Sequence, residues 1–472
     1  MCPKLHLISL GCTKNLVDSE VMLGRLRLCE LVDSITQADV IIINTCGFIQ
    51  AAKQESIQTI LEAANARKSG ALLVVSGCLS ERYASELEQE IPEIDLIIGV
   101  RDYGRIDALL EQKGFSLPRF SIAPTSANTS NALQNPAQNL AKNPAKILSS
   151  HDKVFLASER DERVISGSRI HAYIKLAEGC NQRCSFCAIP SFKGKLQSRS
   201  IDSILQEVEN LAAQGFVDFS FIAQDSSSYL QDMGQTNGLI QLIHALDRQN
   251  IAKNARIHYL YPTSTSPALI EAIIASPIVQ NYFDMPIQHI ADPMLKRMRR
   301  NHTKAQVLEQ LSLMRQAPNA FIRSTFIVGH PGESEAEFAE LEAFLAGGIF
   351  DRVNLFAFSS EEGTLAHTMS EKVPVKTTNK RLNTLRALLK SQDTFTKLKG
   401  SMLEAFIESK SSVSEHFYSA RDRRWGLEID GEILINESEI ESIDTGLYQV
   451  QITEVKDSIL IGKVLTQLQS FA

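Results

Sequence analysis

The sequence predicts an α/β protein built from three successive modules. Apolar runs alternate with helical patterns over residues 1–116 and again over 164–400, and this alternation is typical of parallel sheets. From residue 401 to residue 472, short strand-like stretches at 404–408, 427–429, 432–435, 448–454 and 460–464, separated by glycine and polar residues, instead predict a small antiparallel β-barrel. A chain of 472 residues is long enough for three modules, since a domain commonly takes roughly 150 residues.

The first module is predicted to be a parallel sheet with helices between its strands. We expect strands at 4–10, 39–43, 72–75 and 96–100, and helices at 15–28, 50–68 and 105–113. Cys12, Cys46 and Cys78 each follow the end of a strand and lie beside a glycine. Ligands of open α/β sheets bind at this edge, so the three thiols are expected to meet and hold a metal cluster. Cys2 and Cys29 do not fit this pattern.

Residues 117–163 are predicted to form a linker or surface insertion. The segment is dominated by Asn, Ala, Ser, Gln and Pro, and it sustains neither helical nor strand periodicity. Pro136 and Pro144 also discourage a long helix. We therefore expect this stretch to separate the first module from the second.

The second module, residues 164–400, is predicted to be a partial TIM-like barrel. Six strands are expected, with helical patterns between them, at 170–176, 219–223, 256–261, 282–286, 321–328 and 352–358. A helix-rich connector over 376–399 follows. In barrels of this kind the chemistry takes place at the carboxyl ends of the strands.

The loop after the first of these strands contains three cysteines in a C-x-x-x-C-x-x-C pattern, namely Cys180, Cys184 and Cys187. Three thiolates on one loop favour zinc or an iron–sulfur cluster. A closed structural site normally takes four protein ligands, so three leave one position open. A zinc loop completed by a distant His or Cys is the alternative, but the position at a barrel strand end favours a catalytic cluster.

Composition and charge bound the class of protein. Hydrophobic residues make up 44% and charged residues 22% of the chain, which is typical of a soluble globular protein. No membrane span and no secretory signal are expected, and all eight cysteines lie within residues 1–187. Cysteines confined in this way do not suggest the disulfide framework of a secreted protein, so we expect a cytoplasmic location.

The last module, residues 401–472, carries an excess of acidic residues. It contains 13 Asp and Glu against 6 Lys and Arg, whereas the preceding 400 residues contain 42 of each. Such a module suits a basic protein partner better than a phosphate backbone. An acidic surface that serves only solubility is the alternative.

The three-cysteine loop, with Phe186 before its last cysteine, resembles the signature of radical S-adenosylmethionine (SAM) enzymes. Together with the strand-end cysteines and the terminal barrel, it resembles the radical-SAM methylthiotransferase family, whose terminal barrel is a TRAM domain. Several segments are similar to the RimO-type branch, which modifies an aspartate of ribosomal protein S-twelve, and they include 9–20, 175–181, 223–229, 260–262, 285–290, 324–329, 356–364 and 428–431.

The resemblance implies two [4Fe-4S] clusters and SAM as cofactors. Cys180, Cys184 and Cys187 would hold the cluster that binds and reduces SAM, and Cys12, Cys46 and Cys78 would hold an auxiliary cluster. The implied partners are ribosomal protein S-twelve, or the small subunit that contains it, and a flavodoxin- or ferredoxin-like electron donor. No membrane is implied, and nucleic acid is not the primary substrate. No catalytic acid or base is assigned.

Four further residues are candidates for contacts with SAM. Gln224 lies at the second barrel strand's end, Arg323 lies in the fifth strand, and Gly329 and Gly332 flank the turn after it. Their alternatives are a turn hydrogen bond, an ion pair and ordinary turn glycines. The chain departs from the family pattern at Lys193 and His330, where an arginine and an aromatic residue are usual.

Two other functions compete with this interpretation. A MiaB-type methylthiotransferase would modify an adenosine in tRNA, and it would be expected to carry a basic last module. A non-catalytic iron–sulfur sensor or binding protein would need no SAM. The acidic last module argues against the first of these, and the six-repeat barrel argues against the second.

Overall fold

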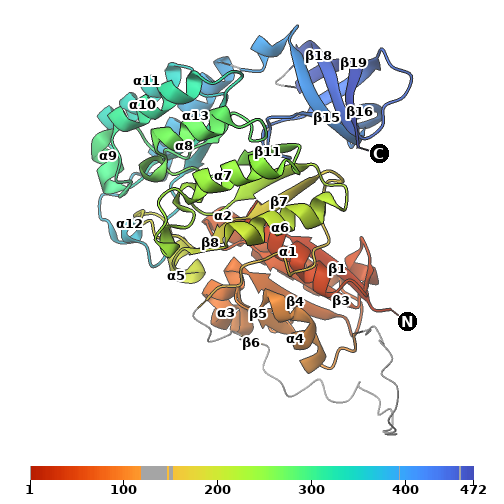
Figure 1. The fold of residues 1–472 in the computed structure, drawn as a ribbon. Helices are drawn as coiled ribbons and strands as arrows, with labels where there is room; N and C mark the ends of the chain where they lie inside the picture. The colour runs from red at the N-terminus through yellow and green to blue at the C-terminus, as the bar shows by residue number, and fades with distance from the viewer. Residues whose placement is uncertain (1, 118–145, 148–152, 393, 457–458, 472) are drawn as a thin grey trace, which may run out of the picture. The chain divides into compact units, whose positions relative to one another are not determined.

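The computed structural model describes residues 2–117, 146–147, 153–392, 394–456 and 459–471 (Figure 1). The chain divides into two compact units. The first contains Met1–Val164 together with Ser191–Gly194, and the second contains Ile165–Pro190 and Lys195–Ala472. Within the described residues, no helix has both the length and the apolar character that crossing a membrane requires.

The first unit contains a six-stranded parallel sheet in the order β2-β1-β3-β4-β5-β6. Its strands are β1 (Lys4–Ser9), β2 (Glu30–Leu31), β3 (Val40–Thr45), β4 (Leu72–Gly77), β5 (Leu96–Ile98) and β6 (Lys146–Ile147). The helices are α1 (Thr13–Arg25), α2 (Gln50–Ala66), α3 (Cys78–Glu90) and α4 (Ile106–Gln112). The predicted strands and helices of this module are confirmed to within a few residues at their ends.

Sequence analysis missed helix α3. The helix starts at Cys78 itself, immediately after β4, so no turn residues separate the two elements. Its apolar residues Leu79, Ala84 and Leu87 pack into the core beneath the sheet. Cys78 therefore lies at a helix N-terminus rather than in a loop.

Residues 118–145 and 148–152 of the predicted linker lie outside the described residues. Residues 153–163 pack on the first unit. Val154 and Ala157 are buried, and the Arg163 guanidinium forms a buried ion pair with Glu20 at 2.6 Å. This end of the segment is thus part of a folded unit.

The second unit begins with two three-stranded parallel sheets, β11-β10-β7 and β12-β13-β14. Their strands are β7 (His171–Lys175), β10 (Asp218–Ile222), β11 (Asn254–Ile257), β12 (Tyr282–Asp284), β13 (Phe321–Val328) and β14 (Arg352–Ala357). The Leu260 N–H donates to the Asp284 carbonyl at 2.7 Å, which links the two sheets. The six predicted barrel strands are thereby confirmed.

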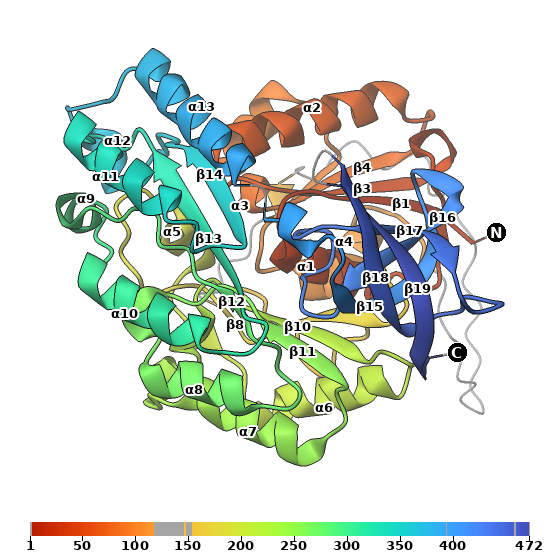
Figure 2. The same cartoon turned by 90° about the horizontal axis from the view of Figure 1, so that it is seen from above.

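Helices cover one face of this curved sheet (Figure 2). They include α6 (Ile201–Ala212), α7 (Gly238–Gln249), α8 (Pro267–Ala275), α10 (Lys304–Arg315), α11 (Glu335–Ala346) and α13 (Val375–Ser391). Apolar side chains of alternate strand positions, such as Ala172, Ile174, Phe219 and Phe221, pack against these helices. The intervening positions hold polar residues, among them His171, Lys175, Asp218 and Ser220, which are also buried.

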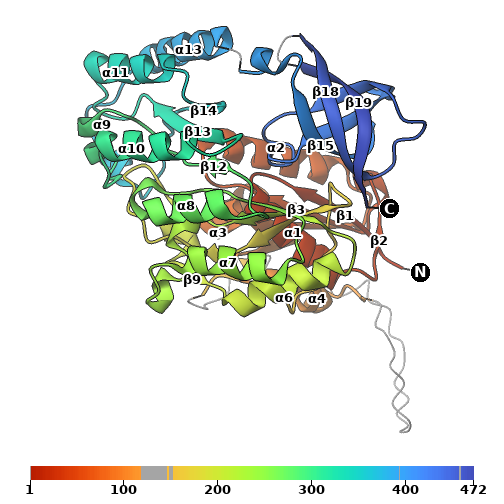
Figure 3. The ribbon, with the colours of Figure 1, turned by 45° about the horizontal axis from the view of Figure 1, so that its top comes forward.

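The chain ends in a closed five-stranded barrel in the order β15-β16-β17-β19-β18 (Figure 3). Its strands are β15 (Met402–Ser411), β16 (Ser414–Asp422), β17 (Ile433–Ser438), β18 (Gly446–Lys456) and β19 (Ile459–Ser470). The predicted small barrel is confirmed, but the predicted strand at 427–429 is wrong. Glu428 has a φ of 60°, which excludes it from a strand, and β16 supplies the missing strand.

The end of β16 and the connection from β16 to β17 pack against the amino-terminal ends of the parallel strands. The Arg421 guanidinium donates to Asp218 at 2.7 Å, and Arg256 pairs with the same buried carboxylate at 2.7 Å. Arg256 also donates to the carbonyls of Arg423 and Arg424 at 2.9 and 3.1 Å. The small barrel is therefore joined to the parallel sheet by buried charge-assisted hydrogen bonds.

Candidate active site: two sets of three cysteines

The first set of cysteines lies at the carboxyl edge of the first unit's sheet. Cys12 follows β1 as the N-cap residue of α1, Cys46 follows β3, and Cys78 follows β4 as the first residue of α3. The strands β1, β3 and β4 are neighbours, so three cysteines far apart in sequence share one edge. The predicted placement of Cys12, Cys46 and Cys78, each just after the end of a strand at one edge of the sheet, is confirmed.

Glycines allow the close approach of these loops. Gly11 has a φ of 88°, and a Cβ atom at this position would overlap the Cys46 side chain. Gly47 lies equally close to the Cys78 backbone, where a Cβ would come within 2.9 Å of the Cys78 carbonyl carbon. Gly11 and Gly47 are thus required by the space that a neighbouring cysteine occupies, and Gly77, beside Cys78, is required by its φ of 106° and by the nearby Thr45 backbone.

Polar side chains that sequence analysis did not single out hold this edge in place. The Asn15 amide donates to the carbonyls of Leu10 and Thr45, at 3.1 and 2.9 Å, and the Cys78 thiol lies 3.7 Å from the Asn15 Oδ1 atom. Ser56 bonds both the N–H and the carbonyl of Cys46 at 3.1 Å. Burial raises the pKa of the Cys46 thiol to about 11, and nearby Cys12 adds to the effect.

The second set lies on the loop after β7 and the short strand β8 (Ala177–Glu178). Gly179 turns the chain with a φ of 75°, and the Cys187 N–H then donates to the Cys184 carbonyl at 3.2 Å. Burial raises the pKa values of the Cys180 and Cys187 thiols to about 12, and the neighbouring Cys184 adds to both shifts. The turn therefore keeps the three cysteines together on one short loop.

The loop is held by side chains that follow two other strands, β10 and β13. The Gln182 amide donates to the buried Asp225 carboxylate at 2.9 Å, and Asp225 also accepts from the Ser227 and Ser228 hydroxyls. On the other side, the Ser185 hydroxyl lies 3.0 Å from His330 Nε2. His330, one of the departures from the family pattern, thus supports the cysteine loop directly.

Both sets fit an iron–sulfur cluster by the chemistry of their donors. Cysteine thiols bind iron as thiolates, because the metal displaces their protons. Within the described part of the chain, no group of three or more His, Cys, Asp or Glu side chains is arranged to hold a single metal ion. A four-iron cluster does not need such a group, since its cysteines ligate different irons.

Arg300 and Tyr261 also contact the second set. Sequence analysis named neither as a site residue, although Tyr261 lies in the RimO-like segment 260–262. Arg300 Nη1 lies 3.4 Å from Cys184 Sγ, and the Tyr261 hydroxyl lies 3.6 Å from the same sulfur. The guanidinium carbon of Arg300 stacks 4.0 Å from the centre of the Tyr261 ring. Neither residue belongs to a short motif with the cysteines, so only the tertiary structure brings them together.

Gln224, a predicted SAM contact, lies at the carboxyl end of β10. Its amide nitrogen donates to Glu178 Oε2 at 2.7 Å, and Glu178 in turn pairs with the buried Lys175 ammonium. The Gln224 Oε1 atom is buried and has no hydrogen-bond partner among the described residues. It is an available acceptor next to the cysteine loop.

The other predicted SAM contacts have partners within the second unit. Arg323 forms ion pairs with Asp430 at 3.0 Å and with Asp284 at 3.8 Å. Gly329 has a φ of 84° and packs directly against Thr378, and Gly332, with a φ of 80°, donates to the Glu371 carbonyl at 2.7 Å. These contacts account for the three residues structurally, and a role toward SAM stays a prediction.

Comparison with known proteins identifies the family. Residues 174–345 match the Radical SAM superfamily, and residues 4–99 match a family described as uncharacterized protein family UPF0004. The chain is 55% identical over 473 aligned residues to the ribosomal protein uS12 methylthiotransferase RimO of Helicobacter hepaticus, covering 98% of both chains. The proteins of the same name from Helicobacter pylori and Wolinella succinogenes are both 54% identical, again over 98% of both chains. This chain belongs to the RimO family.

Membership in the RimO family makes the chain a radical-SAM methylthiotransferase, an enzyme that uses SAM and a [4Fe-4S] cluster. Solved structures agree with the fold. The radical SAM methyltransferase TsrM from Kitasatospora setae, with cobalamin and a [4Fe-4S] cluster bound, aligns with a TM-score of 0.50 and 16% identity over 75% of this chain and 72% of that chain. At this identity the likeness concerns the fold alone.

Proposed function

We propose that this enzyme replaces a hydrogen on the β-carbon of an aspartate in ribosomal protein uS12 with a methylthio group. The observation that carries the proposal is the pair of three-cysteine sets, each at the carboxyl edge of its own parallel sheet. Its relatives, 54–55% identical over almost the whole chain, are named for methylthiolation of uS12. The β-carbon hydrogen is not acidic, so an ordinary base cannot remove it, and SAM with a reduced cluster supplies the necessary radical.

In this proposal Cys180, Cys184 and Cys187 hold the cluster that binds SAM. Gln182, Ser185 and their partners Asp225 and His330 orient the loop. Gln224 presents its free Oε1 atom as an acceptor for a donor group of SAM, such as its ammonium. Gly329 and Gly332 shape the turn after β13. Arg323, which lies in β13, helps to orient SAM.

Cys12, Cys46 and Cys78 hold a second [4Fe-4S] cluster, which carries the sulfur to be inserted. Asn15 and Ser56 fix the loops of this set through the backbone contacts described above. The side chains of the protein position the clusters, SAM and the substrate, because the clusters and SAM carry the difficult chemistry. A second SAM provides the methyl group, and a flavodoxin- or ferredoxin-like protein provides electrons, in the cytoplasm.

The charge of the terminal barrel supports a basic protein as the substrate. Three of its six cations, Arg421, Arg423 and Arg424, are buried or half-buried and bond to the parallel-sheet part of the same unit. Among the described residues of the barrel, two lysines, Lys410 and Lys456, are exposed, against nine exposed carboxylates. The nine carboxylates are those of Glu404, Glu415, Glu428, Glu432, Glu437, Glu439, Glu441, Asp444 and Glu454. A surface of this charge attracts a basic ribosomal protein and repels tRNA.

Mass spectrometry of uS12 and of tRNA, from cells with and without the gene, tests the substrate. We expect uS12 to lose the mass of one methylthio group when the gene is deleted, while the tRNA nucleosides stay unchanged. Loss of the modification from tRNA instead would contradict the proposal and favour the tRNA-modifying alternative. Re-expression of the wild-type chain is the control.

The two-cluster arrangement is tested by iron content and by substitution. Anaerobic reconstitution should give about eight irons per chain, from two four-iron clusters. Cys46→Ala should lower this to about four and abolish methylthiolation, while reductive cleavage of SAM continues. Cys29→Ala is the matched control, since Cys29 belongs to neither set. Loss of SAM cleavage in Cys46→Ala would contradict the separate roles of the two sets.

A further inference from the structure

Arg300 is a buried cation in direct contact with the second set of cysteines. It lies between α9 (Asp292–Arg297) and α10, and only 3% of its surface is exposed. Its flanking residues Arg299 and Asn301 both have a φ of 55°, so the backbone turns sharply on both sides of it. The guanidinium Nη1 lies 3.4 Å from Cys184 Sγ, and Nη2 donates to the Pro286 carbonyl at 2.5 Å.

The charge of Arg300 has no carboxylate partner among the described residues. Four other arginines are buried in the described part of the chain, and each of them forms an ion pair, namely Arg199 with Glu207, Arg256 and Arg421 with Asp218, and Arg381 with Glu333. Arg300 instead contacts a sulfur, a carbonyl and an aromatic ring, and its Nε atom is buried without a hydrogen-bond partner.

Such a charge requires an anion nearby. Burial of an uncompensated ion costs much more free energy than a cation–π contact such as that with Tyr261 returns. The contact within reach that becomes anionic is the sulfur of Cys184, since cysteine ligates a cluster as a thiolate. The arrangement is therefore complete only when the cysteine set is ionised.

We propose that Arg300 is the counter-ion of the SAM-binding cluster and favours its reduction. The proposal rests on the assignment of Cys180, Cys184 and Cys187 as the cluster ligands. One electron enters from a low-potential electron-transfer protein, no bond to the protein forms or breaks, and the site gains one negative charge. A fixed cation beside a ligand sulfur stabilises the state with the extra negative charge, so it raises the reduction potential.

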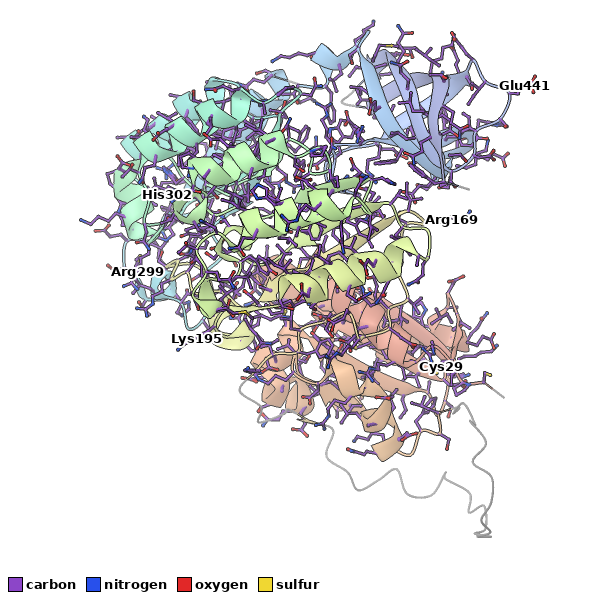
Figure 4. The ribbon with its side chains drawn as sticks, viewed as in Figure 1. Cys29, Arg169, Lys195, Arg299, His302 and Glu441 are labelled. Carbon is purple, nitrogen blue, oxygen red and sulfur yellow. The ribbon has the colours of Figure 1, made fainter. Side chains whose placement is uncertain are left out.

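The test uses the full chain with Cys12, Cys46 and Cys78 replaced by alanine, so that a single cluster is titrated. Iron analysis of this background, expected at about four per chain, is the first measurement. The midpoint potential is then measured by EPR-monitored titration with dithionite for Arg300→Gln, Arg300→Lys and Arg299→Gln. Arg299 is the matched control because it is the adjacent residue, is exposed and carries the same charge (Figure 4).

Arg300→Gln is expected to make reduction at least tenfold less favourable, which lowers the potential by about 59 mV for a one-electron couple. Arg300→Lys should keep most of the wild-type potential, and Arg299→Gln should leave it unchanged, since solvent screens an exposed charge. Loss of iron in Arg300→Gln but not in Arg300→Lys would likewise support a counter-ion.

Three outcomes would overturn the proposal. The first is an unchanged midpoint potential in iron-loaded Arg300→Gln. The second is a lowered potential in Arg300→Lys that equals the one in Arg300→Gln. The third is loss of iron in both Arg300 variants, which would mark a structural role for the guanidinium. Failure of the ligand assignment itself is recognised separately, because the background protein would then lack a four-iron signal before Arg300 is changed.

Discussion

At the scale of single residues, the cysteines of the second set and Arg300 differ in how far the sequence explains their place in the site. The spacing of Cys180, Cys184 and Cys187 is a local pattern that can be read directly from the chain. Arg300 is 116 positions away from Cys184, and no local pattern connects the two. A residue of this kind is found only when the fold has brought the two segments together.

Gly329 offers a test of how a glycine is required by its surroundings. Its φ is 84°, and a Cβ at this position would clash with Thr378 on α13. Gly329→Ala should therefore lower the free energy of unfolding by about 1–2 kcal/mol for the left-handed backbone, and by a further 1–3 kcal/mol or so for overpacking. Urea denaturation measures the loss.

The matched control is Gly215→Ala, because Gly215 has a φ of 100° and open space around it. It should show only the backbone part of the loss. Adding Thr378→Ala to Gly329→Ala should recover the packing part. Equal losses in the two single alanine variants would contradict the assigned clash.

His171 gives the stability a defined dependence on pH. Burial holds its pKa well below the ordinary value, with Arg421, Arg256 and His258 acting in the same direction and Asp218 against it. Below about pH 6.5 the unfolded chain protonates this imidazole and the folded protein does not, so acidification lowers the free energy of unfolding.

Replacing His171 by Gln, which can still reach the Ser220 hydroxyl 2.8 Å away, should flatten this dependence. The slope between about pH 6.5 and 4.5 should fall by up to about 1.4 kcal/mol per pH unit. Urea denaturation at a series of pH values measures the slope. Identical slopes for the wild type and His171→Gln would mean that His171 is protonated in the folded protein.

At the scale of elements, periodicity located β1, β3, β4 and β5 of the first unit's sheet and all six strands of the two three-stranded parallel sheets, but it missed the short strands β2, β6 and β8. It failed at the connection between β16 and β17, where an apolar pair around Glu428 resembled a strand. In the structure this segment is a turn whose Leu427 carbonyl accepts a hydrogen bond from Tyr173 at 3.1 Å. The neighbouring Trp425 packs against Phe321 of the parallel sheet, and periodicity within one module cannot reveal such a contact.

Trp425 should carry much of that packing. Its side chain is fully buried, and its ring centre lies 6.2 Å from that of Phe321 and 5.5 Å from that of Phe395. Trp425→Ala should lower the free energy of unfolding by about 3–5 kcal/mol because it leaves a large cavity. Chemical denaturation measures the loss.

Val413→Ala is the control within the same barrel, since Val413 is 68% exposed. It should change stability by no more than about 0.5 kcal/mol. A loss of similar size in the two variants would show that the connection between β16 and β17 is not a site of tight packing.

At the scale of the whole molecule, the distribution of charge matters more than its total. The net charge of the chain is −7, and the sequence places the acidic excess in the terminal barrel. Only the structure shows that half of that barrel's cations face the parallel sheet, which leaves the rest of the barrel surface more acidic than its composition indicates.

This surface predicts an association that depends on charge. Glu437 and Glu441 are both exposed on the barrel, and Figure 4 shows Glu441 at its edge. Glu437→Gln combined with Glu441→Gln should slow binding of uS12 by on the order of a few-fold and weaken its dependence on salt. Stopped-flow fluorescence at two salt concentrations measures both effects.

The control replaces the exposed Glu271 and Glu309 by Gln on helices of the parallel-sheet part of the same unit. The net charge is then the same, but the acidic barrel surface is intact, so binding should be close to that of the wild type. Equal slowing in both double variants would indicate a general charge effect instead of a docking surface.

The sequence by itself determined the α/β class, the order of the three modules and the six cysteines at strand ends. It could do so because hydrophobic periodicity and ligand spacing are local properties of the chain. The tertiary structure decided what lies beside the cysteines and which charges are buried. Arg300 beside Cys184, Asn15 beside Cys78 and Arg421 on Asp218 are contacts between segments distant in sequence, and their energies depend on burial that exists only once the chain has folded.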